Sequence, residues 1–205
     1  MPNLSKTYLF RMTHIGNIPH ILQNGITHST SANANPNFVA IGDSSLISKR
    51  NGFLLDNGRL LGDYIPFYFG YRTPMLFKMQ KEYGILPENI VYCVSSVQKM
   101  VDLKLDFVFT DGHAIEKFSF QYSLSDIENI ERLLDWKAIK AKYWKDENDL
   151  DLKRKKQAEF LVLGDIAPDG VLDYLTYNEN AKKRIIDFGV DASKVVVKPD
   201  CFFKL

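Results

Sequence analysis

The 205-residue chain has few cysteines, and no apolar run approaches the roughly 18 residues of a membrane helix. Its two cysteines, Cys93 and Cys201, lie far apart without metal-ligand spacing, so we expect buried free thiols rather than a disulfide. Residues 1–7 lack the apolar segment of a signal peptide. We therefore expect a soluble, cytoplasmic protein with no membrane contact, and we also expect a monomer.

The net charge is also small, and this limits how the chain can bind nucleic acid. Lys and Arg number 26 against 25 Asp and Glu, for a formal net charge of +1. A domain that holds nucleic acid by its overall field is more basic than this. Any nucleic-acid site must therefore be a local patch with a short footprint of a few nucleotides.

Several catalytic motifs are absent. The chain has no Gly-rich phosphate loop and no Gly-x-Ser-x-Gly turn, which argues against P-loop NTPases, Rossmann redox enzymes and serine hydrolases of the α/β type. Its four histidines, His14, His20, His28 and His113, lack zinc-ligand spacing. We expect no metal site.

Aromatic residues make up 13% of the chain, and many of them fall in short strand-like segments. Because strands and short helices alternate irregularly, without repeats or a linker, we expect one α+β domain over residues 1–205. Strands are predicted at 7–13, 64–71, 90–95, 107–109, 159–163, 171–176, 194–197 and 201–203, and helices at 17–24, 44–50, 74–83, 125–142 and 178–189.

Three details of this pattern concern helix ends and a strand edge. Asn17 is a candidate N-cap, Pro19 fits a first helical turn, and Gly25 fits the position just past a helix end. Pro66 removes a donor from an aromatic strand, which predicts a bulge or an open edge there. Residues 27–42 are rich in Ser, Thr and Asn and form a loop long enough to be functional.

Glu159 and Arg50 are charged residues at positions that could line a cleft. Glu159 begins an apolar strand, and is either a solvated edge residue or a charge placed in a cleft. Arg50 ends a short helical turn between two loops, and is either a surface group or a planar donor for a phosphate. Arg11 and Thr13 lie on the first strand, where a mid-strand charge must face solvent or a partner.

Basic and aromatic residues are candidates for contact with a nucleic acid. Lys153, Arg154, Lys155 and Lys156 form either a solvated helix face or a phosphate track. Base stacking beside this cluster could come from Tyr68, Tyr71, Arg72 and Met75. Aromatic residues of this kind also fill protein cores. His113 follows a strand end, where it is either structural or part of a site.

Five segments together resemble one family, the DarT toxins of bacterial toxin–antitoxin pairs, which are DNA ADP-ribosyltransferases. The resemblance spans nearly the whole chain from about residue 7. The segments are THIGNIPHILQNGI (13–26), SKRNG (48–52), DYIPFYFGYRTPML (63–76), FVFTDGHA (107–114) and KKQAEFLV (155–162).

This resemblance implies the ADP-ribosyltransferase fold, with two small, mostly antiparallel sheets flanked by short helices around a cleft for NAD. It implies transfer of ADP-ribose from NAD, consumed as a substrate without a metal, to thymine in single-stranded DNA. It also implies a partner, a DarG-like macrodomain antitoxin. By the same resemblance, the catalytic residues are Glu159 and Arg50; the NAD contacts are Arg11, Met12, Thr13, His20, His28 and Arg50; and the DNA contacts are Tyr68, Arg72, Met75, His113, Lys153, Lys155 and Lys156.

Two points stay open at the level of sequence. Arg50 either removes the proton of the acceptor base or stabilises charge without taking that proton. The acceptor is either thymine or another group, such as guanine, RNA or a protein side chain. A third alternative, from a different class, is a catalytically inert module that binds nucleic acid.

Overall fold

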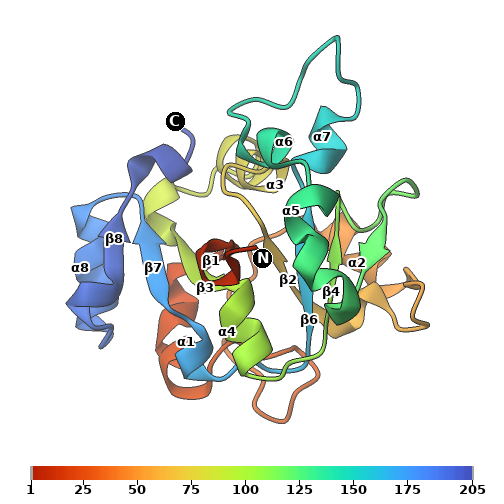
Figure 1. Ribbon diagram of the computed structural model, residues 1–205. Helices are drawn as coiled ribbons and strands as arrows, with labels where there is room; N and C mark the ends of the chain where they lie inside the picture. The colour runs from red at the N-terminus through yellow and green to blue at the C-terminus, as the bar shows by residue number, and fades with distance from the viewer. Residues whose placement is uncertain (1, 205) are drawn as a thin grey trace.

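All strands belong to one sheet in the computed structural model, which describes residues 2–204 (Figure 1). The strand order is β5-β4-β6-β2-β1-β3-β7-β8, and neighbours are antiparallel except for the parallel pair β7 and β8. The strands are β1 (Tyr8–His14), β2 (Tyr64–Tyr68), β3 (Ile90–Ser96), β4 (Phe107–Thr110), β5 (Gln121–Tyr122), β6 (Glu159–Leu163), β7 (Asp173–Thr176) and β8 (Val195–Val197).

The two central strands of the sheet, β1 and β2, meet at a single residue pair. β1 pairs with β3 along its whole length, but with β2 only at Phe10 and Tyr68. The expectation of two separate small sheets is therefore corrected: two halves form one sheet and are joined at one point. The central strand pair, β1 and β2, thus has only one pair of bridged residues.

The edge of β2 beyond this pair stays open, as Pro66 predicts. Pro66 has no N–H to offer to β1, and its carbonyl accepts a hydrogen bond from Nη1 of Arg11 at 2.9 Å. A side chain therefore bridges the two strands where backbone pairing has stopped. This leaves space between β1 and β2 without leaving the carbonyl unpaired.

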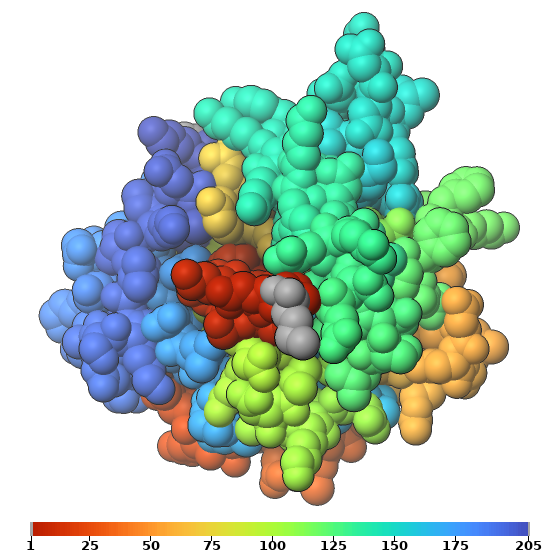
Figure 2. Space-filling model, viewed as in Figure 1, coloured from red at the N-terminus to blue at the C-terminus, as the bar shows by residue number. Residues whose placement is uncertain are grey.

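The helices are short and surround the sheet. They are α1 (Ile18–Asn24), α2 (Ser44–Asn51), α3 (Pro74–Phe77), α4 (Val97–Asp102), α5 (Ile130–Leu133), α6 (Trp136–Lys140), α7 (Leu152–Lys155) and α8 (Glu179–Asp187). α8 packs on β7 and β8. The segment between α6 and α7 projects from the body of the molecule (Figures 1 and 2). Among the described residues, no helix is long and apolar enough to span a bilayer.

Several elements, the unpredicted helix α7 among them, differ from the sequence prediction. The helix expected at 125–142 is broken into a 3₁₀ turn, α5 and α6, because Asp135 accepts from the Ala138 amide and starts a new helix. Residues 201–203 are not a strand; a 3₁₀ turn, Pro199–Cys201, occupies part of this segment. The strand β5 and the helix α4 were not predicted. Both cysteines are free and buried, as predicted.

The long loop before α2 is fastened to β1 by Asn17. The Asn17 side chain donates to the hydroxyl of Thr13 and to the carbonyl of Val39, both at 2.9 Å. It also accepts from the Val39 amide at 2.8 Å, and it makes no capping bond to α1. Asn17 occupies the N-cap position of α1, as predicted, but its side chain closes the loop instead of capping the helix.

The far end of the same loop is held by Asp43. The Asp43 carboxylate accepts from the amide and the hydroxyl of Ser45 at the start of α2, and it pairs with Lys78. The hydrogen bonds from Lys78 and Ser45 hold the pKa of Asp43 well below its usual range. In turn, the bond to Asp43 raises the pKa of Lys78.

These pKa shifts predict how Asp43→Asn changes stability with pH. Because folding lowers the pKa of Asp43, its contribution is present above the ordinary pKa of about 4 and is lost as the pH falls. The contribution of Lys78 is present below its ordinary pKa of about 10. Urea midpoints from pH 3 to 8 should therefore show wild type above Asp43→Asn near neutrality, with the gap closing toward acid. A gap that stays constant would contradict the ion pair.

Gly25 ends α1 in a conformation that requires glycine. Its φ is +78°, and a Cβ there would lie 1.9 Å from the carbonyl oxygen of Ile166. The close approach arises because Ile26 and Ile166 form a β-bridge, which ties α1 to the end of β6. The predicted helix end at Gly25 is confirmed.

Gly25→Ala should destabilise the protein much more than Gly58→Ala. Gly58 has nearly the same φ, +79°, but its Cβ would meet nothing within 4 Å. The control should therefore lose about 1–2 kcal/mol from its left-handed backbone alone. The Gly25 variant should lose several kcal/mol more, or fail to fold, because backbone must move. Urea unfolding of both variants measures the difference, and equal losses would show that the contact with Ile166 is unimportant.

Candidate active site

A cavity lies where β1 and β2 part. Its volume is about 390 Å³, within the range of sites for small ligands. β1, β2, α2 and the loop before α2 supply its walls. From β1 come Arg11, Met12 and Thr13, all of which the sequence indicated as NAD contacts.

Glu159 lies at the base of this region with no exposed surface. It is the first residue of β6 and pairs with Tyr68 across the sheet. One carboxylate oxygen accepts from Nη1 of Arg50 at 2.8 Å, and the other accepts from the amide of Ala114 at 3.1 Å. Glu159 is therefore not a solvated edge residue, but a buried charge whose two oxygens are both satisfied.

Arg50 joins Glu159 to the cavity. It comes from the last turn of α2, its side chain is 14% exposed, and it lines the cavity. Its other terminal nitrogen, Nη2, is buried and has no hydrogen-bond partner among residues 2–204. A buried donor without a partner is costly, so a ligand with acceptor oxygens would complete this site.

Arg11 supplies a second guanidinium to the same wall. Burial lowers its pKa to about 10, and its nearness to Arg50 adds to that effect. The side chain remains protonated at neutral pH, where it donates to the carbonyl of Pro66. Two guanidiniums at one cavity favour an anionic ligand such as a diphosphate.

The two histidines expected to contact NAD have different positions. His28 lines the cavity, and its Nε2 donates to the carbonyl of Gly62 at 2.8 Å. His20 lies on α1 and does not line the cavity; its ring contacts the hydroxyl of Thr27 and the side chain of Asn24. The structure thus brings His28 to the site and leaves His20 beside it.

His113 reaches the cavity from the loop after β4. Its side chain is 9% exposed, and its Nε2 lies 3.7 Å from Oε1 of Glu159. Burial lowers the pKa of His113, although the charge of Glu159 acts in the opposite direction. The imidazole is therefore neutral at neutral pH and can accept a proton.

Arg154 holds the loop that carries His113 and Ala114. Its guanidinium donates to Asp151 at 2.7 and 2.8 Å and to Asp111 at 2.8 Å. It also donates to Ser119, and its own carbonyl accepts from the amide of His113 at 3.1 Å. This role could not be predicted from the sequence, because nothing in a basic run indicates which member meets acidic partners from another loop.

The rest of the basic run is dispersed and does not form the expected phosphate track. Lys153 is exposed, whereas Lys155 lies within 4 Å of Asp135, Asp149 and Asp151. Lys156 is 1% exposed, donates to the carbonyls of Ile139 and Ala141, and has a pKa lowered by burial to about 8. These pairings place Lys156 inside the protein, which corrects its expected surface contact with DNA, whereas a DNA contact of the paired Lys155 stays a prediction.

The other candidates for DNA contact divide between two hollows. Tyr68 and Met75 line the cavity, together with His113. Arg72 lies outside the cavity in a left-handed conformation, with its guanidinium 4.5 Å from the centre of the Phe203 ring. It lines a second, larger hollow at the other end of the β1–β2 junction.

Sequence reasoning missed one further residue that shapes the cavity, Asp165. It follows β6 and accepts from the amide of His28 at 2.7 Å and from the hydroxyl of Ser31 at 2.5 Å. An Asp directly after an apolar strand was the available signal. With Asn17, it fixes the loop that forms the cavity wall.

Comparisons with known proteins agree on one family. The family model for ssDNA thymidine ADP-ribosyltransferase, DarT, matches residues 10–203. A DNA ADP-ribosyl transferase of Thermus sp. (strain 2.9) is 37% identical over 163 residues, which are 76% of this chain and 74% of that protein. A Thermosipho africanus fusion of a DNA ADP-ribosyl transferase and a DNA ADP-ribosyl glycohydrolase is 32% identical over 75% of this chain and 38% of the fusion.

Solved structures give the same result. Thermus sp. 2.9 DarT in complex with ADP-ribosylated ssDNA superposes with a TM-score of 0.85 at 29% identity, covering 98% of both chains. Its complex with NAD⁺ gives a TM-score of 0.80 at 28% identity, covering 98% of this chain and 99% of the other. With a family model that spans nearly all of its length and a relative above 30% identity, the chain belongs to the DarT family of single-stranded DNA thymidine ADP-ribosyltransferases.

Proposed function

We propose that this chain transfers ADP-ribose from NAD to the thymine of a thymidine in single-stranded DNA and releases nicotinamide. The observation that carries the proposal is the buried pair of Glu159 and Arg50 beside a cavity of ligand size. The family supports it, as do the Thermus structures named for NAD⁺ and for ADP-ribosylated ssDNA.

The cavity suits a dinucleotide with a diphosphate. Arg11 provides one guanidinium, and Arg50 provides a second with a free Nη2 donor. Met12 and Thr13 offer an apolar surface and a hydroxyl on the same strand. We propose that these residues, with His28, hold NAD.

Glu159 would act on the ribose. When the bond between nicotinamide nitrogen and ribose C1′ breaks, its electron pair leaves with nicotinamide and positive charge builds on the ribose. A carboxylate held nearby stabilises that charge, and it does so more strongly in a site shielded from water. The amide of Ala114 and the guanidinium of Arg50 fix the carboxylate in place before the reaction.

The new bond joins thymine N3 to ribose C1′, and the proton of N3 must leave. Arginine is effectively always protonated in proteins, and Arg50 already donates to Glu159. We therefore propose an electrostatic role for Arg50, which stabilises the base as it loses its proton. The neutral His113, 3.7 Å from Glu159, is the nearby group with capacity to accept that proton.

A single strand is the substrate that this chemistry requires. N3 lies on the Watson–Crick edge of thymine, which is occupied in a duplex and free in a single strand. We also propose that a DarG-like macrodomain antitoxin reverses the modification. The Thermosipho relative, in which a glycohydrolase is fused to the transferase, supports that pairing.

Glu159→Gln should lower transfer by at least about a hundredfold while the protein stays folded, because it removes the stabilising charge but keeps the side-chain volume. Glu116→Gln is the matched control. Its carboxylate lies 4.0 Å from His113 but is 57% exposed and does not touch Glu159. The assay incubates each protein with NAD and oligonucleotides, and measures products by intact mass.

The oligonucleotide panel decides the acceptor. Single-stranded DNA with and without thymine, matching RNA and duplex DNA should yield one ADP-ribose only on thymine-containing single strands. Modification of a guanine oligonucleotide, RNA or protein instead would show a different acceptor. Full activity in Glu159→Gln would contradict the catalytic role of the carboxylate, and no product on any substrate would favour an inert module.

Arg154→Ala should lower kcat by about ten- to a hundredfold with little change in the KM for NAD. Loss of the guanidinium frees the loop, so the Ala114 amide no longer fixes Glu159, and small displacements at a reacting centre are costly. Arg154→Lys should recover part of the activity. Lys153→Ala removes an exposed neighbour and is the control, and an equal loss there would contradict the positioning role.

A further inference from the structure

A second hollow opens at the other end of the β1–β2 junction. It is a groove of about 1290 Å³, larger than the range of about 300–1,000 Å³ for sites that hold one small molecule. Its walls come from the N-terminal segment, the residues after β2, α6 with the residues that follow it, and the C-terminal segment. A groove of this size and shape accommodates an extended polymer.

The groove gathers positive charge. Six of its lining residues are Lys or Arg and two are acidic, although the whole chain has 26 basic and 25 acidic residues. Within residues 2–204, none of the six lies within 4 Å of a carboxylate. The basic residues are Lys6, Arg72, Lys81, Lys140, Lys142 and Lys204.

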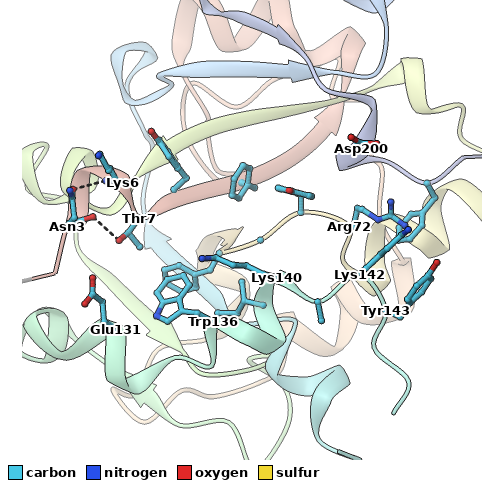
Figure 3. Close-up of a pocket in the computed structure, with 18 of the residues that line it drawn as sticks. Asn3, Lys6, Thr7, Arg72, Glu131, Trp136, Lys140, Lys142, Tyr143 and Asp200 are labelled. Atoms are coloured by element: carbon cyan, nitrogen blue, oxygen red, sulfur yellow. Dashed lines mark hydrogen bonds between the residues drawn. The ribbon is translucent and has the colours of Figure 1, made fainter.

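These cations are spread along the groove (Figure 3). Lys6 lies near one end, Lys140 lies over the middle, and Arg72 and Lys142 lie together at the other end. This spacing differs from a compact pocket for a single anion. It is typical of a surface that follows a phosphate backbone.

Three tyrosine rings also line the groove and remain accessible. Tyr8 is 46% exposed, Tyr71 is 37% exposed and Tyr143 is 66% exposed. The ammonium of Lys142 lies 5.5 Å from the centre of the Tyr143 ring. Exposed rings beside cations are the combination with which proteins bind single strands, because bases stack while phosphates are neutralised.

Neighbouring residues of two chain segments line the groove and the active-site cavity. On β1, Phe10 lines the groove and Arg11 lines the cavity. After β2, the order is similar: Tyr68 lines the cavity, and Gly70 to Arg72 line the groove. A strand with one base in the cavity would therefore reach the groove within a few nucleotides.

The groove wall is also fixed from behind. Buried Lys156 donates to the carbonyls of Ile139 and Ala141, the residues on both sides of Lys140. This anchors the end of α6, from which Lys140 and Lys142 project. The buried lysine thus has a use other than DNA contact.

We propose that this groove binds the nucleotides that flank the acceptor thymine, with phosphates on Lys140, Lys142 and Arg72 and a base on Tyr143. The inference rests on the proposed function and names the surface that carries the rest of the substrate. It supplies the local basic patch that the near-zero net charge demands, on residues that pack against the basic run 153–156 rather than on the run itself.

The test compares oligonucleotide length and salt dependence. Wild type, Lys140→Gln/Lys142→Gln and Tyr143→Ala are titrated by fluorescence anisotropy with thymine-containing strands of about three and about twelve nucleotides. For the long strand, the slope of log K against log salt should fall in magnitude by about 1.4 in the double lysine variant. Tyr143→Ala should weaken the long strand by roughly tenfold, and neither variant should change binding of the short strand or the KM for NAD.

Lys183→Gln/Lys194→Gln is the control, because both lysines are exposed and line neither hollow. The inference is overturned if wild type binds both lengths equally, or if the control lowers the slope as much as the groove variant. Modification of the short strand is measured in parallel. If wild type modifies neither strand, the proposed function fails; if it modifies both with no effect of the groove variants, the groove inference alone fails.

Discussion

The contact on which the site depends is the single pairing of β1 and β2 at Phe10 and Tyr68. A sheet is normally continuous because an unpaired backbone edge inside a protein is costly. Here the edge of β2 is open, and two local features reduce the cost of its unpaired backbone. Pro66 has no donor to leave unpaired, and Arg11 satisfies its carbonyl with a side chain. The opening is thus compatible with a stable sheet.

The same parting explains how a carboxylate can be both buried and functional. Glu159 stands opposite Tyr68 at this junction, so its side chain is in the protein interior yet next to the cavity. Burial of a lone carboxylate would be strongly unfavourable, and the guanidinium of Arg50 and the amide of Ala114 offset it. Because Arg50 is also a cavity residue, ligand binding and the environment of Glu159 are physically coupled.

Much of the fold could be predicted from the sequence, because local residue patterns determine where most strands and helices form. Aromatic and β-branched runs located seven of the eight strands, and Gly25 and Pro66 marked a helix end and an open edge. The resemblance in ordered segments led to Glu159 and Arg50, which the structure brings within 2.8 Å. Strand register at the centre could not be predicted, since it depends on residues 50 or more positions apart.

The failures concern side chains whose partners come from elsewhere in the chain. Asn17 has the residue type and position of a helix cap, but its side chain bonds the backbone of Val39 instead of the helix. In the basic run 153–156, Arg154 and Lys155 form ion pairs with aspartates, and Lys156 donates to backbone carbonyls. Sequence shows how much charge a segment carries, but not whether that charge is already paired.

This distinction between total and unpaired charge bears on how a nearly neutral protein can hold a polyanion. Electrostatic attraction at physiological salt is screened beyond about 8 Å, so distant charges contribute little and the nearest few decide. In the run 153–156, Arg154 and Lys155 are paired with aspartates and Lys156 is buried against carbonyls, whereas the basic residues of the groove form no ion pair among residues 2–204. A net charge of +1 is then no obstacle, because six basic residues line the groove against two acidic ones, and this local excess is what a bound strand meets. The surface that counts is the one where cations are left without partners, next to rings on which bases can stack.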